Sequence, residues 1–254
     1  TYMYCIRDQG LRYGLDFNWA KIMYLSINCN PCIRTLDEQL MKRVNSMVYL
    51  GGLLSDDGHV ASELGRRIGL AHTEFSTLHR IWSHANLTIA KKLSYFHTFI
   101  VSKLMFAVDS MWLSNIELKR LDAFHCTCLR RILKIQHSFY SRISNDIVLD
   151  RAKAKPLSSI LAKRQLKLFG RIAIMPNSND LLPLVFDDDL YTKPHAAPRR
   201  RGRPRICWID EVHNMAIRVA GSEINPANIL SQCASSLKPW LNAIDTYFTP
   251  SNIS

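Results

Sequence analysis

The stretch SNIELKRLDAFHCTCLRRILKI, from Ser114 to Ile135, predicts a long amphipathic helix. Ser114 and Glu117 have the spacing of a capping box, in which each side chain accepts a hydrogen bond from a free backbone N–H at the helix start. Apolar residues then recur every three or four positions, as one buried face of an α-helix requires; they are Leu118, Leu121, Phe124, Cys128 and Ile132. The other side is expected to be exposed and basic, with Lys119, Arg120, Arg130 and Arg131.

Helical spacing also precedes this stretch. Between residues 59 and 85 an apolar stripe is formed by Val60, Leu64, Ile68, Ala71, Phe75, Leu78, Trp82 and Ala85. A second helix is expected from about Thr88 to Met111, with a buried line of Ile89, Leu93, Phe96, Ile100, Leu104 and Val108. Residues 59–150 are therefore expected to form a helical bundle with a basic outer surface.

Further helices are expected after this bundle. Leu157–Met175 reads as a basic helix, and Cys207–Gly221 reads as a short helix with Gly221 as its C-cap. Ser235–Phe248 is a weaker helical candidate that Pro239 interrupts. With a loop at about 176–204, residues 151–254 are predicted to be a basic C-terminal region of short helices.

The first 58 residues have a different pattern. The segments KIMYLSI, Lys21–Ile27, and NSMVYLGGLL, Asn45–Leu54, read as short strands, and Ser55–Gly58 reads as a turn. These strands fit an antiparallel or α/β region. The predicted fold class is therefore mainly α, with a small α/β part at residues 1–58, a helical bundle at 59–150 and a basic helical region at 151–254.

The charge of the chain is distributed unevenly. Its net charge is +12, and 47% of its residues are apolar, which is enough for a folded core. Residues 1–58 carry 6 basic and 6 acidic side chains, residues 59–150 carry 12 and 7, and residues 151–254 carry 15 and 8. The positive excess therefore grows towards the C-terminus, which indicates a polyanionic partner such as nucleic acid.

The composition also indicates the compartment. The longest apolar runs are shorter than the roughly 18–20 residues that a membrane span needs, so no membrane partner is expected. The seven cysteines show no spacing typical of a disulfide framework, which fits a reducing, intracellular location. The chain begins at Thr1 rather than at Met, and we expect it to be a fragment or a cleaved product.

Motifs that carry chemistry are weak in this chain. Cys29–Cys32 is a CxxC and His125–Cys128 is HCTC, but a zinc site built from both pairs is disfavoured against ordinary thiols, because no further ligand pair follows at finger spacing. The run Asp187–Asp189 lies in the expected loop and reads as a solvated turn. No phosphate-binding glycine loop and no hydrolase or zinc-protease motif is present. These motifs alone therefore do not define an enzyme.

Two stretches become informative together. They are YGLDFNWAKIMYL, Tyr13–Leu25, and VYLGGLLSDDG, Val48–Gly58. In this order they resemble the palm of reverse transcriptases from non-LTR (LINE-type) retrotransposons. The resemblance continues through Arg66–Trp82, Lys103–Leu113, Leu121–Ile135, Arg164–Pro176 and Arg200–Val212, so it spans most of the chain.

The resemblance implies roles for particular residues. Lys21 matches a lysine near the incoming nucleotide, where it would protonate the leaving pyrophosphate; otherwise it is a plain strand-edge lysine. Tyr49, Leu50 and Gly51 match the primer-grip turn, which otherwise reads as a plain hairpin turn. The helices at 59–135 would be the thumb, whose basic residues contact the phosphates of the RNA template and DNA; the candidates here are Arg66, Arg67, Arg130 and Arg131.

The chain also departs from the family pattern. The paired aspartates that hold two Mg²⁺ ions precede the Gly-Leu-x-x-Asn-x-x-Lys segment in this family, and no such pair precedes it here. No cofactor is therefore expected in this fragment, although Mg²⁺ is expected for a full-length polymerase. Ala107 and Lys134 stand where the family commonly has glycine, and Arg171 stands where it commonly has histidine. Such departures are typical of a decayed copy, and the fragment alone is predicted to be inactive.

The stretch RRRGRPR, Arg199–Arg205, has two interpretations. Its core resembles an AT-hook, whose arginines enter a narrow minor groove. Its position behind a palm and a thumb favours non-specific phosphate contacts by Arg199, Arg200, Arg201, Arg203 and Arg205. A nuclear location is expected for such a protein. The alternatives are a non-enzymatic helical protein that binds nucleic acid and a helical scaffold for other proteins.

Overall fold

The chain is mainly α-helical in the computed structural model, as its sequence predicts. The structure describes residues 2–27, 29–36, 38–84, 86–176, 179–187, 191, 193–194, 207–221, 226–231, 233 and 236–249. The chain divides into two compact units, Thr1–Glu63 and Leu64–Ser254. The predicted bundle and the C-terminal helices thus belong to one unit.

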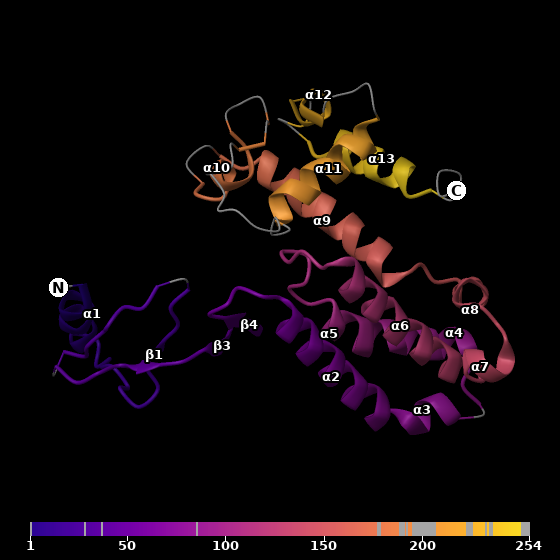
Figure 1. The fold of residues 1–254 in the computed structure, drawn as a ribbon, viewed down its shortest axis with the longest axis horizontal. Coiled ribbons are helices and arrows are strands. Elements are labelled where there is room, and N and C mark those ends of the chain that lie inside the picture. Colours follow the sequence, from indigo (N-terminus) through magenta and orange to yellow (C-terminus); the bar gives the residue numbers. More distant parts are fainter. Residues whose placement is uncertain are drawn as a thin grey trace. The chain divides into compact units, whose positions relative to one another are not determined.

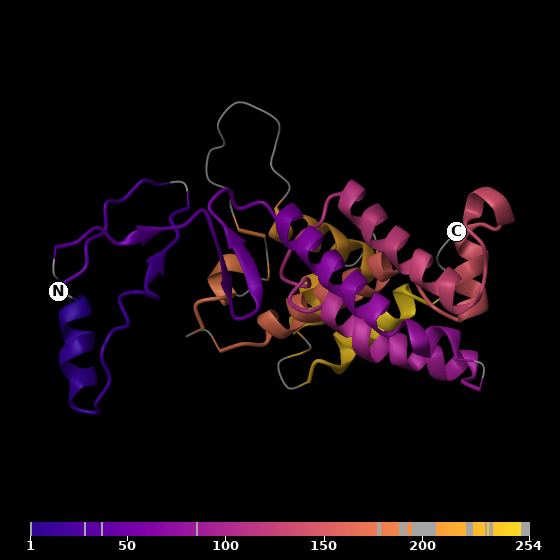
Figure 2. The ribbon, with the colours of Figure 1, turned by 90° about the horizontal axis from the view of Figure 1, so that it is seen from below.

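The N-terminal unit has little regular structure (Figure 2). It opens with α1 (Tyr2–Leu11), which the sequence did not reveal and which has no buried residue. Two short parallel strands follow, β1 (Met23–Tyr24) and β2 (Lys42–Arg43). Among the described residues of this unit no apolar side chain is buried, so the unit has no hydrophobic core of its own.

A β-hairpin ends the N-terminal unit, as predicted from sequence. Strand β3 (Ser46–Tyr49) pairs antiparallel with β4 (Gly52–Ser55), and Tyr49 lies opposite Gly52. The two turn residues, Leu50 and Gly51, have φ angles of 48° and 83°. Positive φ at both positions gives the turn the twist that a two-residue hairpin requires.

The C-terminal unit is built from helices around α9 (Figure 1). In chain order the helices are α2 (Ala61–Thr77), α3 (His79–Ser83), α4 (Ile89–Tyr95), the π-helical η1 (Phe96–Val101), α5 (Ser102–Leu104), α6 (Asn115–Ile132), α7 (Ser138–Ser141), α8 (Asn145–Ala152), α9 (Leu157–Ala173), α10 (Leu182–Val185), α11 (Trp208–Ala220), α12 (Pro226–Ser231) and α13 (Lys238–Tyr247). Helix α9 contacts α6 on one side and α10, α11 and α13 on the other, so it joins the bundle to the later helices.

Helix α6 begins with the predicted capping box. The N–H of Ser114 donates to Glu117 Oε2 at 2.6 Å, and the N–H of Glu117 donates to Ser114 Oγ at 3.4 Å. One turn further on, Asp122 accepts a hydrogen bond of 2.9 Å from the N–H of Ser158. Since Ser158 lies at the start of α9, Asp122 caps that helix from a neighbouring one.

The helices before α6 are more broken than the apolar periodicity predicts. The stripe at 59–85 is divided at Leu78 into α2 and α3, and Trp82 Nε1 then donates to the carbonyl of Phe75 at 2.7 Å. The helix expected to reach Met111 ends near Leu104, because Ala107 has a φ of 57° that no helix accommodates. Ile89, expected to be buried, is 51% exposed.

The later helices enclose an apolar cluster. It gathers side chains from α9, α10, α11, α12 and α13, with Phe169 and Trp240 fully buried. Trp240 Nε1 donates to the carbonyl of Leu166 at 2.8 Å, and its ring packs directly on Gly170. Pro239 lies in the first turn of α13 and starts this helix rather than interrupting it, because the first turn needs no N–H donor there. Gly221, with a φ of 93°, ends α11 as predicted.

Candidate nucleic-acid interface

The palm-like residues lie in two separate places of the N-terminal unit. Lys21 is exposed in a turn directly before β1, where its N–H donates to Asn18 O at 2.9 Å. Tyr49, Leu50 and Gly51 form the tip of the hairpin, and the side chains of Tyr49 and Leu50 are 61% and 81% exposed. Both segments are therefore accessible to a ligand.

The arginines of α2 are less accessible than expected. Arg66 is half-buried. Arg67 is only 7% exposed, its Nη1 donates to Lys103 O at 3.3 Å, and its guanidinium lies 4.9 Å from the ring centre of Phe106. Arg67 thus holds α2 against the end of α5, and these contacts favour a structural role over a phosphate contact.

Arg130 was expected on the exposed side of α6, and this expectation is wrong. It is 6% exposed, and its guanidinium donates to the carbonyl of Ile143 at 2.7 Å and to Asn145 Oδ1 at 3.0 Å. A third contact reaches the carbonyl of Gln136 at 3.4 Å. Arg130 therefore fixes the segment between α6 and α8, whose carbonyls would otherwise lack these donors.

Arg131 and Lys134 are the exposed cations at the end of α6. Within the part of the chain that the structure describes, neither side chain makes a hydrogen bond or an ion pair. Lys134 has a φ of 56° and follows the C-cap residue Leu133. The N–H of Ile135 donates to Arg130 O at 2.9 Å and that of Lys134 to Arg131 O at 3.3 Å, which is the Schellman pattern of helix termination.

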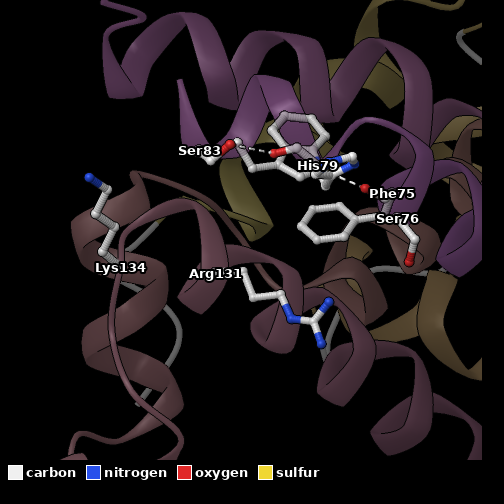
Figure 3. Close-up of a pocket in the computed structure, with 7 residues that line it drawn as sticks. Phe75, Ser76, His79, Ser83, Arg131 and Lys134 are labelled. Carbon is white, nitrogen blue, oxygen red and sulfur yellow. Dashed lines mark hydrogen bonds between the residues drawn. The ribbon is translucent and has the colours of Figure 1, made fainter. Parts of the chain in front are cut away.

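These two cations line a pocket of about 300 Å³ between α2, α3 and the end of α6 (Figure 3). Phe75 and Trp82 stack with their ring centres 4.9 Å apart and form its apolar wall. Ser76, His79 and Ser83 supply polar groups around it, and Ser83 Oγ donates to His79 O at 3.0 Å. Figure 3 shows Arg131 and Lys134 extending from α6 on the side opposite these groups.

A second pocket, of about 390 Å³, adjoins the first at Arg131. Residues of α6, α7 and α8 line it, among them Thr127, Arg130, His137, Ser138 and Asn145. Among the described residues no aspartate or glutamate lines either pocket. We call the two together the α6 pockets; their cations and hydroxyls, without carboxylates, are suited to an anionic ligand.

A column of aromatic rings supports the first pocket from within. Phe75 meets Phe96 edge-on with ring centres 6.0 Å apart, and Phe96 stacks on His125 at 5.7 Å. His125 is fully buried, and neither of its ring nitrogens has a hydrogen-bond partner in the described part of the chain. Burial lowers the pKa of His125 to about 4, with a smaller contribution from His97. The ring is therefore neutral at pH 7 and acts as packing.

Among the described residues, the cysteines considered as metal ligands form no metal-binding group. Cys126 and Cys128 are both buried, and burial raises the pKa of Cys128 to about 12, which opposes the thiolate form that zinc binds. Over the described residues, no three His, Cys, Asp or Glu side chains form a group that could hold a metal ion. Asp188 and Asp189 lie outside those residues.

The Arg-rich stretch lies outside the described residues. The interpretation of Arg199, Arg200, Arg201, Arg203 and Arg205 therefore rests on sequence. Within the described residues, no helix combines the length and the apolar character that a membrane span requires.

The sequence predicts Arg131 as a basic contact residue but does not predict the groups that lie around it. The contributions of Ser76, His79 and Ser83 depend on the break at Leu78, which turns α3 relative to α2. The useful signal was the pair Arg131 and Lys134, three residues apart at a helix end.

Comparisons with protein-family models, with curated proteins and with solved structures gave no match for this chain. The chain's own residues and geometry must therefore indicate its function.

Proposed function

We propose that the chain is the C-terminal part of a LINE-type RNA-directed DNA polymerase that binds template–primer or target nucleic acid. The N-terminal unit would be the end of the palm, with its hairpin as the primer grip. The first helices of the C-terminal unit would be the thumb, and the Arg-rich stretch would add phosphate contacts.

The observation that carries this proposal is the backbone conformation of Ala107 and Lys134. At these two positions the family commonly has glycine, and both residues have positive φ here, 57° and 56°. Only seven non-glycine residues of the described chain have positive φ. Glycine adopts this conformation without a steric cost, so positive φ at both positions is the conformation for which glycine would be favoured there. This agreement supports the resemblance, because the backbone φ angle is a property independent of the sequence motifs that suggested it.

Surface chemistry supports the binding half of the proposal. The α6 pockets are lined by exposed cations and, among the described residues, by no carboxylate, and the regions after residue 58 carry 27 basic against 15 acidic side chains. Phosphate groups are the common anionic partner of such surfaces.

The exposed apolar side chains of the N-terminal unit fit a palm remnant. Tyr2, Tyr13 and Leu15 are between 67% and 81% exposed, although residues of this kind are usually covered. We assign their cover to the preceding part of the palm.

No metal-dependent step is assigned to the chain. Asp56 and Asp57 follow the Gly-Leu-x-x-Asn-x-x-Lys segment instead of preceding it, and no third ligand accompanies them among the described residues. These residues therefore do not fit a two-Mg²⁺ site. Lys21 would contribute to leaving-group protonation only in a complete palm.

Incubation of the chain with primed RNA template, deoxynucleotides and magnesium tests the proposal. We expect retention of the template–primer without extension of the primer. Primer extension by the chain alone would refute the role assigned to the missing aspartates, and failure to retain any template–primer would refute the binding function.

The alternative of a non-enzymatic binder is distinguished by the reading frame upstream of Thr1. An aromatic-x-Asp-Asp turn encoded there supports the polymerase. A frame that lacks such a turn supports the binder.

A further inference from the structure

We propose that the α6 pockets are a binding site for single-stranded nucleic acid, in which Arg131 holds the phosphate between two neighbouring nucleotides. This inference rests on the proposed function, and it specifies both the site and the form of the ligand. The thumb-like helices and their basic residues do not by themselves distinguish a single strand from a duplex.

Arg131 lies where the two pockets meet. It lines both pockets, and its guanidinium makes no hydrogen bond or ion pair with the described residues. A ligand that occupies both pockets must therefore pass beside this cation. The planar guanidinium binds two phosphate oxygens at once, which suits a group lying between two bound units.

The size and lining of the pockets suit nucleotides. Their volumes, about 300 and 390 Å³, are at the lower end of the range for small-molecule sites, which is suitable for one nucleotide each. The first pocket offers the stacked pair Phe75 and Trp82 as an apolar wall, with Lys134 beside it. The second offers hydroxyl groups and an amide, from Thr127, Ser138 and Asn145. The pockets thus combine apolar groups for the face of a base, polar groups for its edge and the sugar, and cations for the phosphate.

Pockets of this kind favour an unpaired strand over a duplex. In a duplex the bases are stacked and paired, and only the phosphates and groove edges reach a protein surface. Exposed cations on a convex helix would suffice for such contacts, and pockets would not increase the affinity for a duplex. Unpaired bases can leave the stack and enter a pocket, which is the usual way in which proteins bind single strands.

The test compares two charge-matched variants of the full chain. In the pocket variant, Arg131→Gln and Lys134→Gln remove the two cations without introducing opposite charge. In the control variant, Lys91→Gln and Arg151→Gln remove an equal charge from exposed positions that line neither pocket. Thermal melting by circular dichroism checks that all proteins fold.

Fluorescence anisotropy with a short fluorescein-labelled single-stranded oligonucleotide of mixed sequence then measures affinity. We expect the pocket variant to bind about tenfold more weakly than wild type or worse, because two charge-assisted contacts are lost. The slope of log K against log salt should become less steep by about 1.4, or 0.7 for each lost contact. The control variant should bind within about twofold of wild type.

Each other outcome has a defined meaning. Equal weakening of both variants would overturn the site, while binding by wild type would still support the proposed function. Displacement of the labelled strand by a duplex of the same sequence at lower concentration than by the unlabelled strand would overturn the single-strand preference. Displacement by a free nucleoside monophosphate as effectively as by the strand would show a mononucleotide site and overturn the strand assignment. No binding by wild type would contradict the proposed function itself.

Discussion

At the scale of the residue, Ala107 and Lys134 are held in a backbone conformation that their side chains disfavour. Both follow helix ends, Ala107 after α5 and Lys134 after α6, and both have φ angles close to 57°. A non-glycine residue with such a positive φ is less stable than glycine in the same conformation by about 1 kcal/mol. The chain therefore carries local strain at two positions where glycine would relieve it.

We expect Ala107→Gly and Lys134→Gly each to raise the free energy of unfolding by up to about 1 kcal/mol. Urea denaturation measures this change. The matched control is Ala90→Gly in the exposed first turn of α4, which should lower the free energy of unfolding by up to about 1 kcal/mol. A loss of stability in both test variants would contradict the assigned conformation.

Gly170 is required for a different reason, the close approach of Trp240. A Cβ added at Gly170 would lie 2.6 Å from Trp240 Nε1 and closer still to Cδ1 of the same ring. Because the ring is fully buried and its N–H is bonded to Leu166 O, it has little room to move. We expect Gly170→Ala to lower the free energy of unfolding by about 1–3 kcal/mol.

Gly69 provides the comparison for this substitution. It lies within α2, and an added Cβ there meets no atom within 4 Å. Gly69→Ala should therefore raise the unfolding free energy by about 1 kcal/mol through helix propensity. Equal effects of the two substitutions would show that Trp240 does not pack on Gly170.

The buried His125 should make the free energy of unfolding depend on pH. Its pKa falls from 6.5 to about 4 on folding, so between these values the unfolded chain binds a proton that the native chain does not. Stability is therefore full above pH 6.5 and falls as the pH drops towards 4, by about 3 kcal/mol in all. Burial also lowers the pKa of His97 and His213, which adds to the loss in the same direction.

We expect His125→Leu to reduce this loss on acidification, since the remaining histidines account for only part of it. Urea denaturation at a series of pH values measures the effect. The variant should also be more stable than wild type at neutral pH by about 1–3 kcal/mol, because two unpaired ring nitrogens leave the core. An unchanged pH profile would contradict the burial of this ring.

At the scale of the element, neighbouring arginines of α6 have opposite roles. Arg130 points into the protein and binds the segment that leads to α8, whereas Arg131 is exposed. Their sequence context is almost the same, and only the position on the helix separates them.

We expect Arg130→Gln to lower the free energy of unfolding by about 2 kcal/mol or more, because the carbonyl of Ile143 and the side chain of Asn145 lose a charged donor. Arg131→Gln should leave stability unchanged and weaken binding to nucleic acid. Thermal unfolding and anisotropy measured on the same two proteins separate the roles. Loss of stability in Arg131→Gln with none in Arg130→Gln would reverse this assignment.

The elements themselves were predictable where local chemistry determines them. The capping box of Ser114 and Glu117, the C-cap at Gly221 and the hairpin around Leu50 and Gly51 depend on neighbouring residues, and the sequence predicts them correctly. The break at Leu78 was not predicted, because the hydrophobic stripe continues through it. The burial of Lys92 was not predicted either. Its Nζ donates to the carbonyl of Trp82, and only tertiary packing brings these two groups together.

The candidate site was predictable only in part for the same reason. Arg131 follows from the periodicity of α6, but its two pockets require α3, α7 and α8 to pack beside that helix end. Spacing along one helix predicts which side chains share a face, and it does not reveal which loops return to cover that face. Arg67 and Arg130 were therefore expected at the surface and are buried.

At the scale of the whole molecule, the two units differ in how they are stabilised. The C-terminal unit has an extensive buried core, and the N-terminal unit has no buried apolar side chain among its described residues. A palm remnant whose core belongs to a preceding segment would have this property. The excess of basic residues lies in the C-terminal unit, so we expect the proposed binding of nucleic acid to depend on that unit rather than on the N-terminal one.

The most direct test of the account is the affinity of the chain for nucleic acid across a salt series. We expect tight binding at low salt and a linear fall of log K with log salt, with a slope of about −0.7 to −0.9 for each contacted phosphate. A slope that corresponds to several phosphates would agree with the basic surface as the contact region. Absence of binding even at low salt would contradict the account and leave a protein scaffold as the better interpretation.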